Sequence, residues 1–276
     1  MTYSLILAAH GTTDGPAFRE VLEPHAERLR RLCIFRDVTT AYWKEPVYFR
    51  DAVAACASDE IIVVPFFASE GYYTRSVLPR ELGLGDGAND TGRTVRLARA
   101  VGTHRGWCDR LAGVVDGVLA ARGIASAATT LLLIGHGTRR HADSAKSVEL
   151  LTSSLKRLGC VRDVQCCFLD QEPGIDSAVD RVRTEEVLAI PFLVANGVHA
   201  AFDVGSRLGL TVGSALDVGE AANRPSPEAM VGESGGRRVI LTRTVFGEAW
   251  VTDMIVDLAC EVVEVPLRDS TVEGRL

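Results

Sequence analysis

Two stretches of the chain end an apolar run with the same His-Gly-Thr sequence. The first, LILAAHGTTDG, covers residues 5–15, and the second, LLLIGHGTRRH, covers residues 131–141. His10 and His136 therefore follow predicted strands and lie 126 positions apart. An imidazole titrates near neutral pH and binds borderline divalent metals. These residues could move protons, bind a metal ion, or do both.

More polar residues follow the other strands predicted in the second half of the chain. Asp170 and Glu172 follow its second strand, and His199 follows its third. Parallel α/β sheets bind ligands beyond the carboxyl ends of their strands, so we expect these groups to meet His136 at one sheet edge. Two imidazoles with one or two carboxylates form a mixed nitrogen and oxygen site that suits cobalt, iron, nickel or zinc.

Each of these residues has an ordinary structural explanation when taken alone. A lone His after a strand can cap the next helix, and Glu172 before a Pro can favour a helix dipole. His199 can be an ordinary residue at a helix N-terminus. Their convergence at one edge is what favours metal binding or acid–base chemistry.

The two halves match well beyond the His-Gly-Thr sequences. Residues 60–84 match residues 186–210, again 126 positions apart. Glu45-Pro46 pairs with Glu172-Pro173 if a one-residue gap is allowed. Because these blocks occur in the same order, we interpret the chain as a duplicated domain with halves at residues 1–125 and 126–276.

The last matching blocks, residues 95–115 and 239–259, are 144 positions apart. This larger spacing predicts about 18 additional residues in the second half. They fall near 212–236, where Gly, Pro and Ser are frequent, and indicate a mobile insertion.

Strand and helix patterns alternate in both halves, which predicts an α/β fold. Near-continuous Val, Ile and Leu runs are typical of parallel strands that are covered on both faces. We therefore expect two similar doubly wound lobes, each with a mostly parallel four-stranded sheet, and a cleft between them. The predicted strands are residues 3–9, 36–43, 60–68, 94–101, 129–135, 162–169, 186–195 and 238–245.

Composition excludes several other classes of protein. The chain has 276 residues, a net charge of −6 and no dense Lys/Arg run, which argues against nucleic acid as a partner. Its longest apolar runs are too short to span a membrane, and no signal pattern starts the chain, so we expect a cytoplasmic protein. Seven cysteines without C-x-x-C spacing favour reduced, mostly buried thiols and no iron–sulfur cluster.

Neither His-Gly-Thr stretch has the glycine spacing of a nucleotide-binding loop, so we expect no nucleotide cofactor. A phosphohistidine phosphatase or mutase usually has Arg before its His-Gly, but Ala9 and Gly135 occupy those positions here.

Three motifs resemble the class II tetrapyrrole chelatases, specifically the sirohydrochlorin cobalt and iron chelatases. They are LLLIGHGTR at 131–139, CFLDQEP at 167–173 and IPFLVANGVHAAFDV at 190–204. The resemblance covers nearly the whole chain, because long members of this family are tandem duplications. It implies insertion of Co²⁺, or alternatively Fe²⁺, into sirohydrochlorin in cobalamin or sirohaem synthesis.

The resemblance also implies roles for individual residues. His136 and His199 would hold the metal and accept pyrrole protons, and Asp203 follows His199 as the family pattern expects. Asp170 and Glu172 are alternative carboxylates, since the segment after the second strand is one residue shorter than usual in the family.

The first half departs from the family pattern. It keeps His10, but Tyr73 stands where His199 stands in the second half. We therefore expect the second half to carry the active site and the first half a degenerate one, with His10 and Tyr73 still able to touch the substrate.

The implied substrate has eight carboxylates, so an acidic protein must bind it through local positive charge. The candidate basic residues are Arg139, Arg140, Lys146 and Arg75. Phe192, Tyr72 and Phe202 are candidates for covering the macrocycle.

Two other functions remain open from the residues. One is a non-catalytic carrier of metal or tetrapyrrole that descends from a chelatase, and the other is a chelatase for another metal, such as nickel or zinc, or another macrocycle. A two-lobed chain could form the whole cleft alone, which favours a monomer.

Overall fold

The computed structural model describes residues 2–13, 17–84, 92–138, 143–194, 204–210 and 228–263. The chain divides into two compact units. The first unit contains Met1–His104 and Gly247–Leu276, and the second contains Arg105–Phe246. Within the described ranges, no helix has the length and apolar character needed to cross a membrane.

The first unit is built on a four-stranded parallel sheet in the order β2-β1-β3-β4. Its interior residues are almost entirely aliphatic, and β1 is buried from Leu5 to Ala9. This fits a parallel sheet that is covered on both faces. The strands are β1 (Tyr3–Ala9), β2 (Val38–Tyr42), β3 (Glu60–Pro65) and β4 (Thr94–Leu97).

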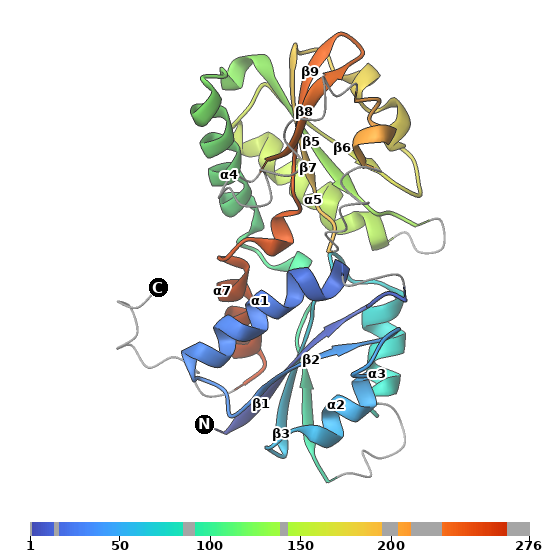
Figure 1. The fold of residues 1–276 in the computed structure, drawn as a ribbon, viewed down its shortest axis with the longest axis vertical. Coiled ribbons are helices and arrows are strands. Elements are labelled where there is room, and N and C mark those ends of the chain that lie inside the picture. Colours follow the sequence, from blue (N-terminus) through green and yellow to red (C-terminus); the bar gives the residue numbers. More distant parts are fainter. Residues whose placement is uncertain are drawn as a thin grey trace. The chain divides into compact units, whose positions relative to one another are not determined.

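Helices cover both faces of this sheet, as Figure 1 shows. On one face lie α1 and α7, and on the other lie α2 and α3. In α1, the residues Val21, Leu22, Ala26 and Leu29 are buried, a spacing that places an apolar stripe toward the sheet. The helices are α1 (Ala17–Leu32), α2 (Phe49–Ala55), α3 (Leu78–Glu81) and α7 (Val251–Glu261). A short π-helical segment, η1 (Tyr73–Val77), precedes α3.

The second unit has a five-stranded sheet in the order β6-β5-β7-β9-β8. Its strands are β5 (Thr129–Gly135), β6 (Asp163–Phe168), β7 (Glu186–Pro191), β8 (Glu228–Ser234) and β9 (Arg237–Thr242). The α-helices α4 (Trp107–Arg122) and α5 (Asp143–Leu158) pack against each other. The short 3₁₀ helices η4 (Ile175–Ser177) and η5 (Val179–Arg181) follow β6. Strands β5 and β7 are paired parallel and form the buried centre of this sheet.

The edge strand β8 corrects one expectation. A mobile insertion was predicted near 212–236, but residues 228–234 pair antiparallel with β9 and extend the sheet to five strands. Gly235 and Gly236 join the two strands with φ values of 55° and 70°. Positive φ at both central residues is typical of a type I′ hairpin turn, and glycine adopts this backbone readily. Residues 211–227 lie outside the described part of the chain.

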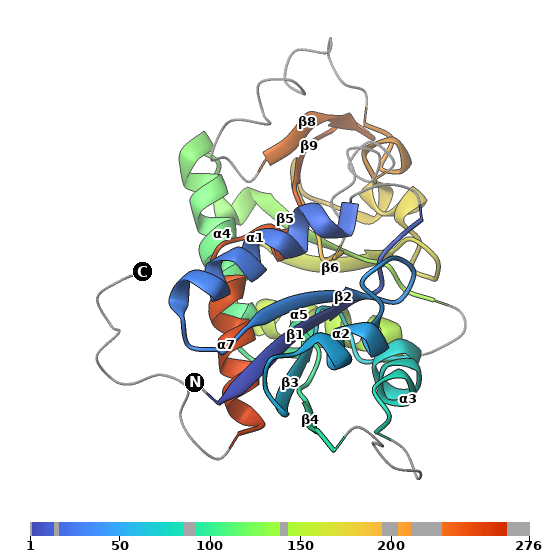
Figure 2. The ribbon, with the colours of Figure 1, turned by 60° about the horizontal axis from the view of Figure 1, so that its bottom comes forward.

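The boundary between the units does not fall at residue 125, where the sequence repeat divides. Helix α4 follows β4 in the chain but belongs to the second unit, and α7 follows β9 but belongs to the first. Figure 2 shows α7 beside α1 in the first unit. The His25 Nδ1 and Thr252 Oγ1 atoms join these two helices at 2.8 Å in a buried contact. Each repeat therefore provides its last helix to the unit built on the strands of the other.

Trp107 shows why α4 belongs to the second unit. Its side chain is almost fully buried, and its ring centroid lies 4.8 Å from that of Phe192 and 4.9 Å from that of Phe246. Aromatic rings at these separations form favourable edge-to-face or tilted pairs and bury large apolar areas. The Phe192 side chain, expected from the sequence to cover a macrocycle, lies instead in this core.

Replacing Trp107 with Ala should destabilise the second unit by about 3–5 kcal/mol, since it removes a buried aromatic side chain. Hydrogen exchange followed by mass spectrometry should show faster exchange in β5 and β7. The matched control is Val251→Ala, 144 positions later in α7, which should act on the first unit. If Trp107→Ala instead caused faster hydrogen exchange in β1 and β3, the assignment of α4 to the second unit would be wrong.

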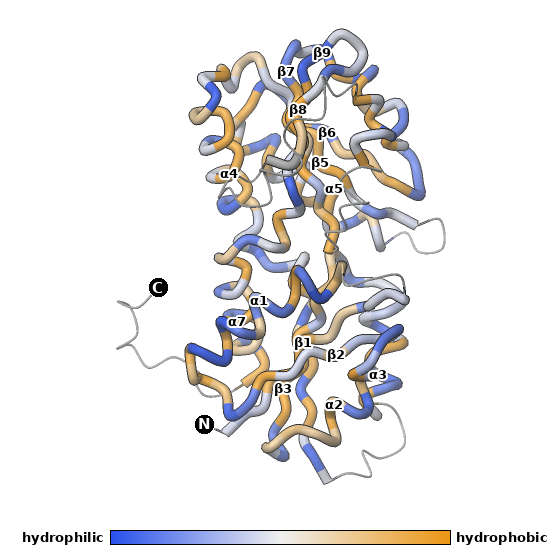
Figure 3. The backbone as a smooth tube through the Cα atoms, viewed as in Figure 1, coloured by the Kyte–Doolittle hydropathy of each residue, from blue (hydrophilic) through white to orange (hydrophobic). Residues whose placement is uncertain are grey.

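The predicted strands agree with the structure in number and order, except for β8, although most end one to four residues earlier than expected. Figure 3 shows the apolar colouring along β1, β3 and β5. Both units have a separate apolar core, one around Ile6 and Val63 and the other around Ile134 and Ala189.

Candidate active site

His136 is the first residue after β5, and its imidazole is exposed. Its Nδ1 atom lies 2.9 Å from the carbonyl oxygen of Gly137. A carbonyl oxygen can only accept, so in the neutral ring Nδ1 carries the hydrogen and donates it. The Nε2 atom then holds the lone pair, which can accept a proton or bind a metal ion.

Asp170 follows β6 and lies beside His136. Its Oδ2 atom is 3.4 Å from His136 Nδ1, and both side chains are largely exposed. The Asp170 N–H donates to the His136 carbonyl oxygen at 2.9 Å, and the Leu169 N–H donates to that of Gly135 at 3.1 Å. Parallel pairing of β5 and β6 thus continues past the strand ends and brings an imidazole and a carboxylate together.

Gln171 fixes the turn that follows His136. Its Oε1 atom accepts the Thr138 N–H at 2.9 Å. Gly137 has a φ of 67°, and a Cβ atom there would lie 2.5 Å from Gln171 Cγ. Only glycine fits this backbone conformation and this close approach. Gln171 was not singled out from the sequence.

The Glu172 side chain is engaged elsewhere. Its Oε2 atom accepts the Gly174 N–H at 2.8 Å, and the side chain is exposed. Of the two candidate carboxylates, Asp170 is the one that the structure places beside His136.

The first unit repeats this backbone arrangement around His10. The His10 Nδ1 atom lies 2.9 Å from the Gly11 carbonyl oxygen, and the Lys44 N–H donates to the His10 carbonyl oxygen at 3.0 Å. Glu45 Oε1 accepts the Thr12 N–H at 3.2 Å. Lys44 thus occupies the place of Asp170, and Glu45 occupies that of Gln171.

This correspondence corrects the one-residue gap in the sequence match. Glu45 was paired with Glu172, but the shared hydrogen bonds pair it with Gln171, at the constant spacing of 126. Phe49 and Ile175, which are both buried, agree with the gapless match. The sequence already indicated this gapless match, since FRDAV at 49–53 and IDSAV at 175–179 align at the same spacing of 126 positions.

Charges around His10 differ from those around His136. The Glu45 carboxylate is bound by the Arg19 guanidinium, with Nε 2.7 Å from Oε2, and Arg19 also lies over the Tyr42 ring. The hydrogen bond that Arg19 donates to the Glu45 carboxylate is the largest cause that raises the pKa of Arg19. At the positions of Asp170 and Gln171 in the second unit, the first unit therefore has Lys44 and an ion-paired Glu45.

Tyr73 lies against His10 in the first unit. Their ring centroids are 4.5 Å apart and the ring planes are nearly perpendicular. The rings of Tyr72 and Phe67 lie 5.7 and 6.3 Å from that of Tyr73. At the strand edge of the first unit, His10 thus belongs to an aromatic cluster.

Other residues expected at the site are distributed as follows. Lys146 is exposed in the first turn of α5, with Nζ 4.0 Å from Asp143, and Arg75 is exposed in η1. His199, Asp203, Arg139, Arg140 and Phe202 lie outside the described residues. Within the part of the chain that is described, no group of three or more His, Cys, Asp or Glu side chains is arranged to hold a metal ion.

All seven cysteines are free thiols. Cys167 packs in the core of the second unit, and burial raises its pKa to about 12. Cys166 faces the other side of β6, where burial raises the pKa of its thiol. The two neighbours point to opposite faces of the strand, as the sequence predicts.

The mostly parallel sheet in each unit, followed after its first strand by a His-Gly-Thr turn, is shared with the class II tetrapyrrole chelatases, and the chain is an enzyme of this class. The chain belongs to the CbiX family, whose family model matches residues 4–113 and 130–262. A relative from Halobacterium salinarum, described as a "probable sirohydrochlorin cobaltochelatase", is 30% identical over 219 residues, covering 73% of this chain and 75% of the relative.

Two solved structures share the fold. A multi-domain protein of Deinococcus radiodurans, described as similar to chelatases with two additional domains, has a TM-score of 0.71 and 26% identity over 94% of this chain. That match spans only 54% of the Deinococcus protein. CbiX, described as the terminal enzyme for siroheme biosynthesis in denitrifying bacteria, has a TM-score of 0.70 and 20% identity, covering 94% of this chain and 99% of that one.

Proposed function

We propose that this enzyme inserts a divalent metal ion into sirohydrochlorin, with Co²⁺ as the preferred metal and Fe²⁺ as the alternative, in cobalamin or sirohaem synthesis. The second unit is the working one. The observation that carries this proposal is the pairing of His136 with Asp170 at the carboxyl ends of β5 and β6. The Halobacterium relative, by its description, supports the substrate and the choice of cobalt.

The charge difference between the two units supports this assignment. Next to a metal dication, Asp170 lowers the energy of the bound state, whereas Lys44 at the matching position raises it. Arg19 further neutralises Glu45 in the first unit. Both units keep the same backbone geometry, so the difference lies in side-chain charge.

The residues of the second unit suit the chemistry of metal insertion. Two pyrrole N–H protons must leave the macrocycle, and the metal must exchange its water ligands for pyrrole nitrogens. His136 Nε2 carries the lone pair and can accept one proton, while Asp170 provides a second weak base and a negative charge. We assign His199 as the second imidazole of the site on the resemblance to the family. Lys146, Arg139, Arg140 and Arg75 are candidates to bind substrate carboxylates.

A direct assay tests the proposal. Purified protein is mixed with metal-free sirohydrochlorin and Co²⁺, Fe²⁺, Ni²⁺ or Zn²⁺, and the absorbance change is compared with a protein-free control. We expect faster insertion with Co²⁺, and Fe²⁺ next. A larger acceleration with Ni²⁺ or Zn²⁺ would reassign the metal.

The same mixture distinguishes an enzyme from a carrier. A carrier would bind sirohydrochlorin or the metal in stoichiometric amounts without accelerating insertion. Tight binding with no acceleration by any metal would overturn the catalytic proposal.

A further inference from the structure

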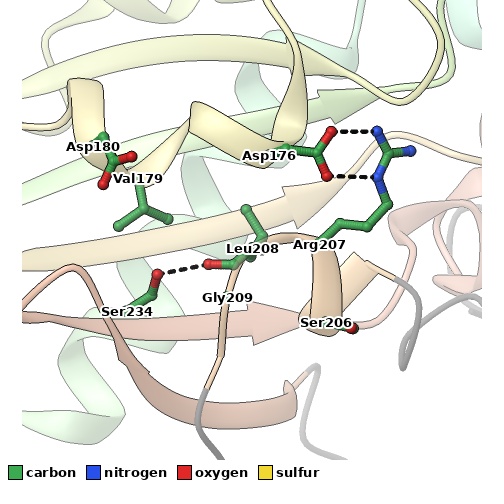
Figure 4. Close-up of a pocket in the computed structure, with 8 residues that line it drawn as sticks. All are labelled: Asp176, Val179, Asp180, Ser206, Arg207, Leu208, Gly209 and Ser234. Carbon is green, nitrogen blue, oxygen red and sulfur yellow. Dashed lines mark hydrogen bonds and ion pairs between the residues drawn. The ribbon is translucent and has the colours of Figure 1, made fainter.

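Arg207 contacts two separate segments of the second unit. It ends a helical turn at residues 204–207 and lies on the wall of a polar cavity of about 360 Å³ (Figure 4). Its Nε and Nη2 atoms donate to the two carboxylate oxygens of Asp176 at 3.0 and 2.7 Å. Its Nη2 atom also donates to the backbone carbonyl oxygen of Leu169 at 3.0 Å. A planar guanidinium has enough donors in a fixed fork to make all three bonds.

The Leu169 carbonyl belongs to the peptide unit from which Asp170 departs. The other polar group of that unit, the Asp170 N–H, donates to the His136 carbonyl oxygen at 2.9 Å. Both polar groups of the peptide are therefore bonded, one to Arg207 and one to the end of β5. This holds the peptide plane and the position of the Asp170 Cα atom, from which the carboxylate reaches to 3.4 Å from His136 Nδ1.

The first unit contains the same ion pair with its charges exchanged. Arg50 and Glu81 lie 126 positions before Asp176 and Arg207, and Arg50 Nη2 is 3.6 Å from Glu81 Oε2. A carboxylate only accepts hydrogen bonds, so Glu81 cannot hold the backbone carbonyl that corresponds to that of Leu169. The second unit has its arginine, Arg207, on the helical turn, and this arginine can donate to the carbonyl oxygen at the end of the neighbouring strand.

We propose that Arg207 is a positioning residue that holds the Leu169–Asp170 peptide and so orients Asp170 beside His136. This inference rests on the proposed function, because Asp170 is the group that it places. The Arg207 guanidinium also holds the pKa of Asp176 below its usual range, so the pair keeps both charges at neutral pH.

Exchanging the charges in the second unit tests this role. The double variant Asp176→Arg with Arg207→Glu keeps an ion pair but installs the arrangement of the first unit. We expect kcat for metal insertion to fall about tenfold, since small misplacements of reacting groups have effects of this size or larger. The KM for sirohydrochlorin should stay within about twofold of that of the parent enzyme. The amides of Leu169 and Asp170 should exchange hydrogen about tenfold faster, with the rest of the unit unchanged.

Two further variants complete the test. The matched control, Arg50→Glu with Glu81→Arg, makes the same exchange in the first unit and should leave kcat within about twofold. The single variant Arg207→Lys keeps a charged donor, so its kcat should lie between that of the parent enzyme and that of the double variant.

Three results for the double variant Asp176→Arg with Arg207→Glu would overturn the inference. The first is that kcat and the hydrogen exchange of Leu169 and Asp170 do not change. The second is a rise in KM in place of a fall in kcat, and the third is faster hydrogen exchange throughout the second unit. If the parent enzyme inserts no metal, the proposed function fails, but the exchange of Leu169 and Asp170 still decides whether Arg207 holds this peptide.

Discussion

His136→Ala should lower kcat for metal insertion at least about 100-fold, because a positioned acid–base group typically contributes 10²–10⁴-fold. The substitution removes Nε2, the atom that carries the lone pair, together with the Nδ1 contact to the Gly137 carbonyl oxygen. It leaves the hydrogen bonds between the backbone groups of the two strand ends in place. The measurement is the initial rate of the absorbance change of sirohydrochlorin with Co²⁺. On the family resemblance, we expect His199→Ala to cause a similar loss.

His10→Ala is the matched control for this variant. His10 makes the same Nδ1 contact with the following carbonyl oxygen as His136 does, so both substitutions remove the same side-chain contact with the turn. We expect His10→Ala to lower kcat by only about threefold. The reverse order of effects would place the working site in the first unit.

Asp170→Asn should lower kcat about 10- to 100-fold. The amide keeps the size of the side chain, and the backbone bond to His136 is unaffected, so the change removes mainly a negative charge and a weak base. The rate of metal insertion and the affinity for Co²⁺ alone, measured by competition with a chelating dye, should both decrease.

Glu172→Gln is the control for Asp170→Asn, because it removes the charge of the other candidate carboxylate. The amide oxygen of glutamine can still accept the Gly174 N–H, so the local structure is retained. We expect this variant to remain within about threefold of the parent rate. If Glu172→Gln were the more damaging change, Glu172 and not Asp170 would be the carboxylate of the site.

The repeat made most of the fold predictable. Constant spacing between halves and continuous apolar runs predict eight strands along the chain and mostly parallel pairing within each half, and both are confirmed. The exchange of α4 and α7 was not predicted, because both helices have apolar faces that suit either sheet. Choosing between them depends on contacts such as those of Trp107 with Phe192, which join residues far apart in the chain.

The candidate site was only partly predictable. Strand ends place His136 near Asp170, and this proximity follows from β5 pairing with β6. The sequence left Asp170 and Glu172 as alternatives, because the segment after the second strand is one residue shorter than usual in the family. Separately, the gap that aligned the two Glu-Pro pairs hid the correspondence of Glu45 with Gln171. The Thr12 N–H donates to Glu45 and the Thr138 N–H donates to Gln171, and these equivalent bonds show how the two halves align. The role of Arg207 depends on a bond to a backbone carbonyl, which no pattern of side-chain types indicates.

The exchanged helices also determine the order in which the molecule can be completed during synthesis. The second unit is one continuous segment, Arg105–Phe246, whereas the first unit needs α7, which ends at Glu261. Strands β1 to β4 leave the ribosome first, yet α1 and β3 lack their partner helix until the second unit has been translated. The half that is made first is thus finished last, and until then the part of its sheet that α7 covers stays open to contact with other nascent chains.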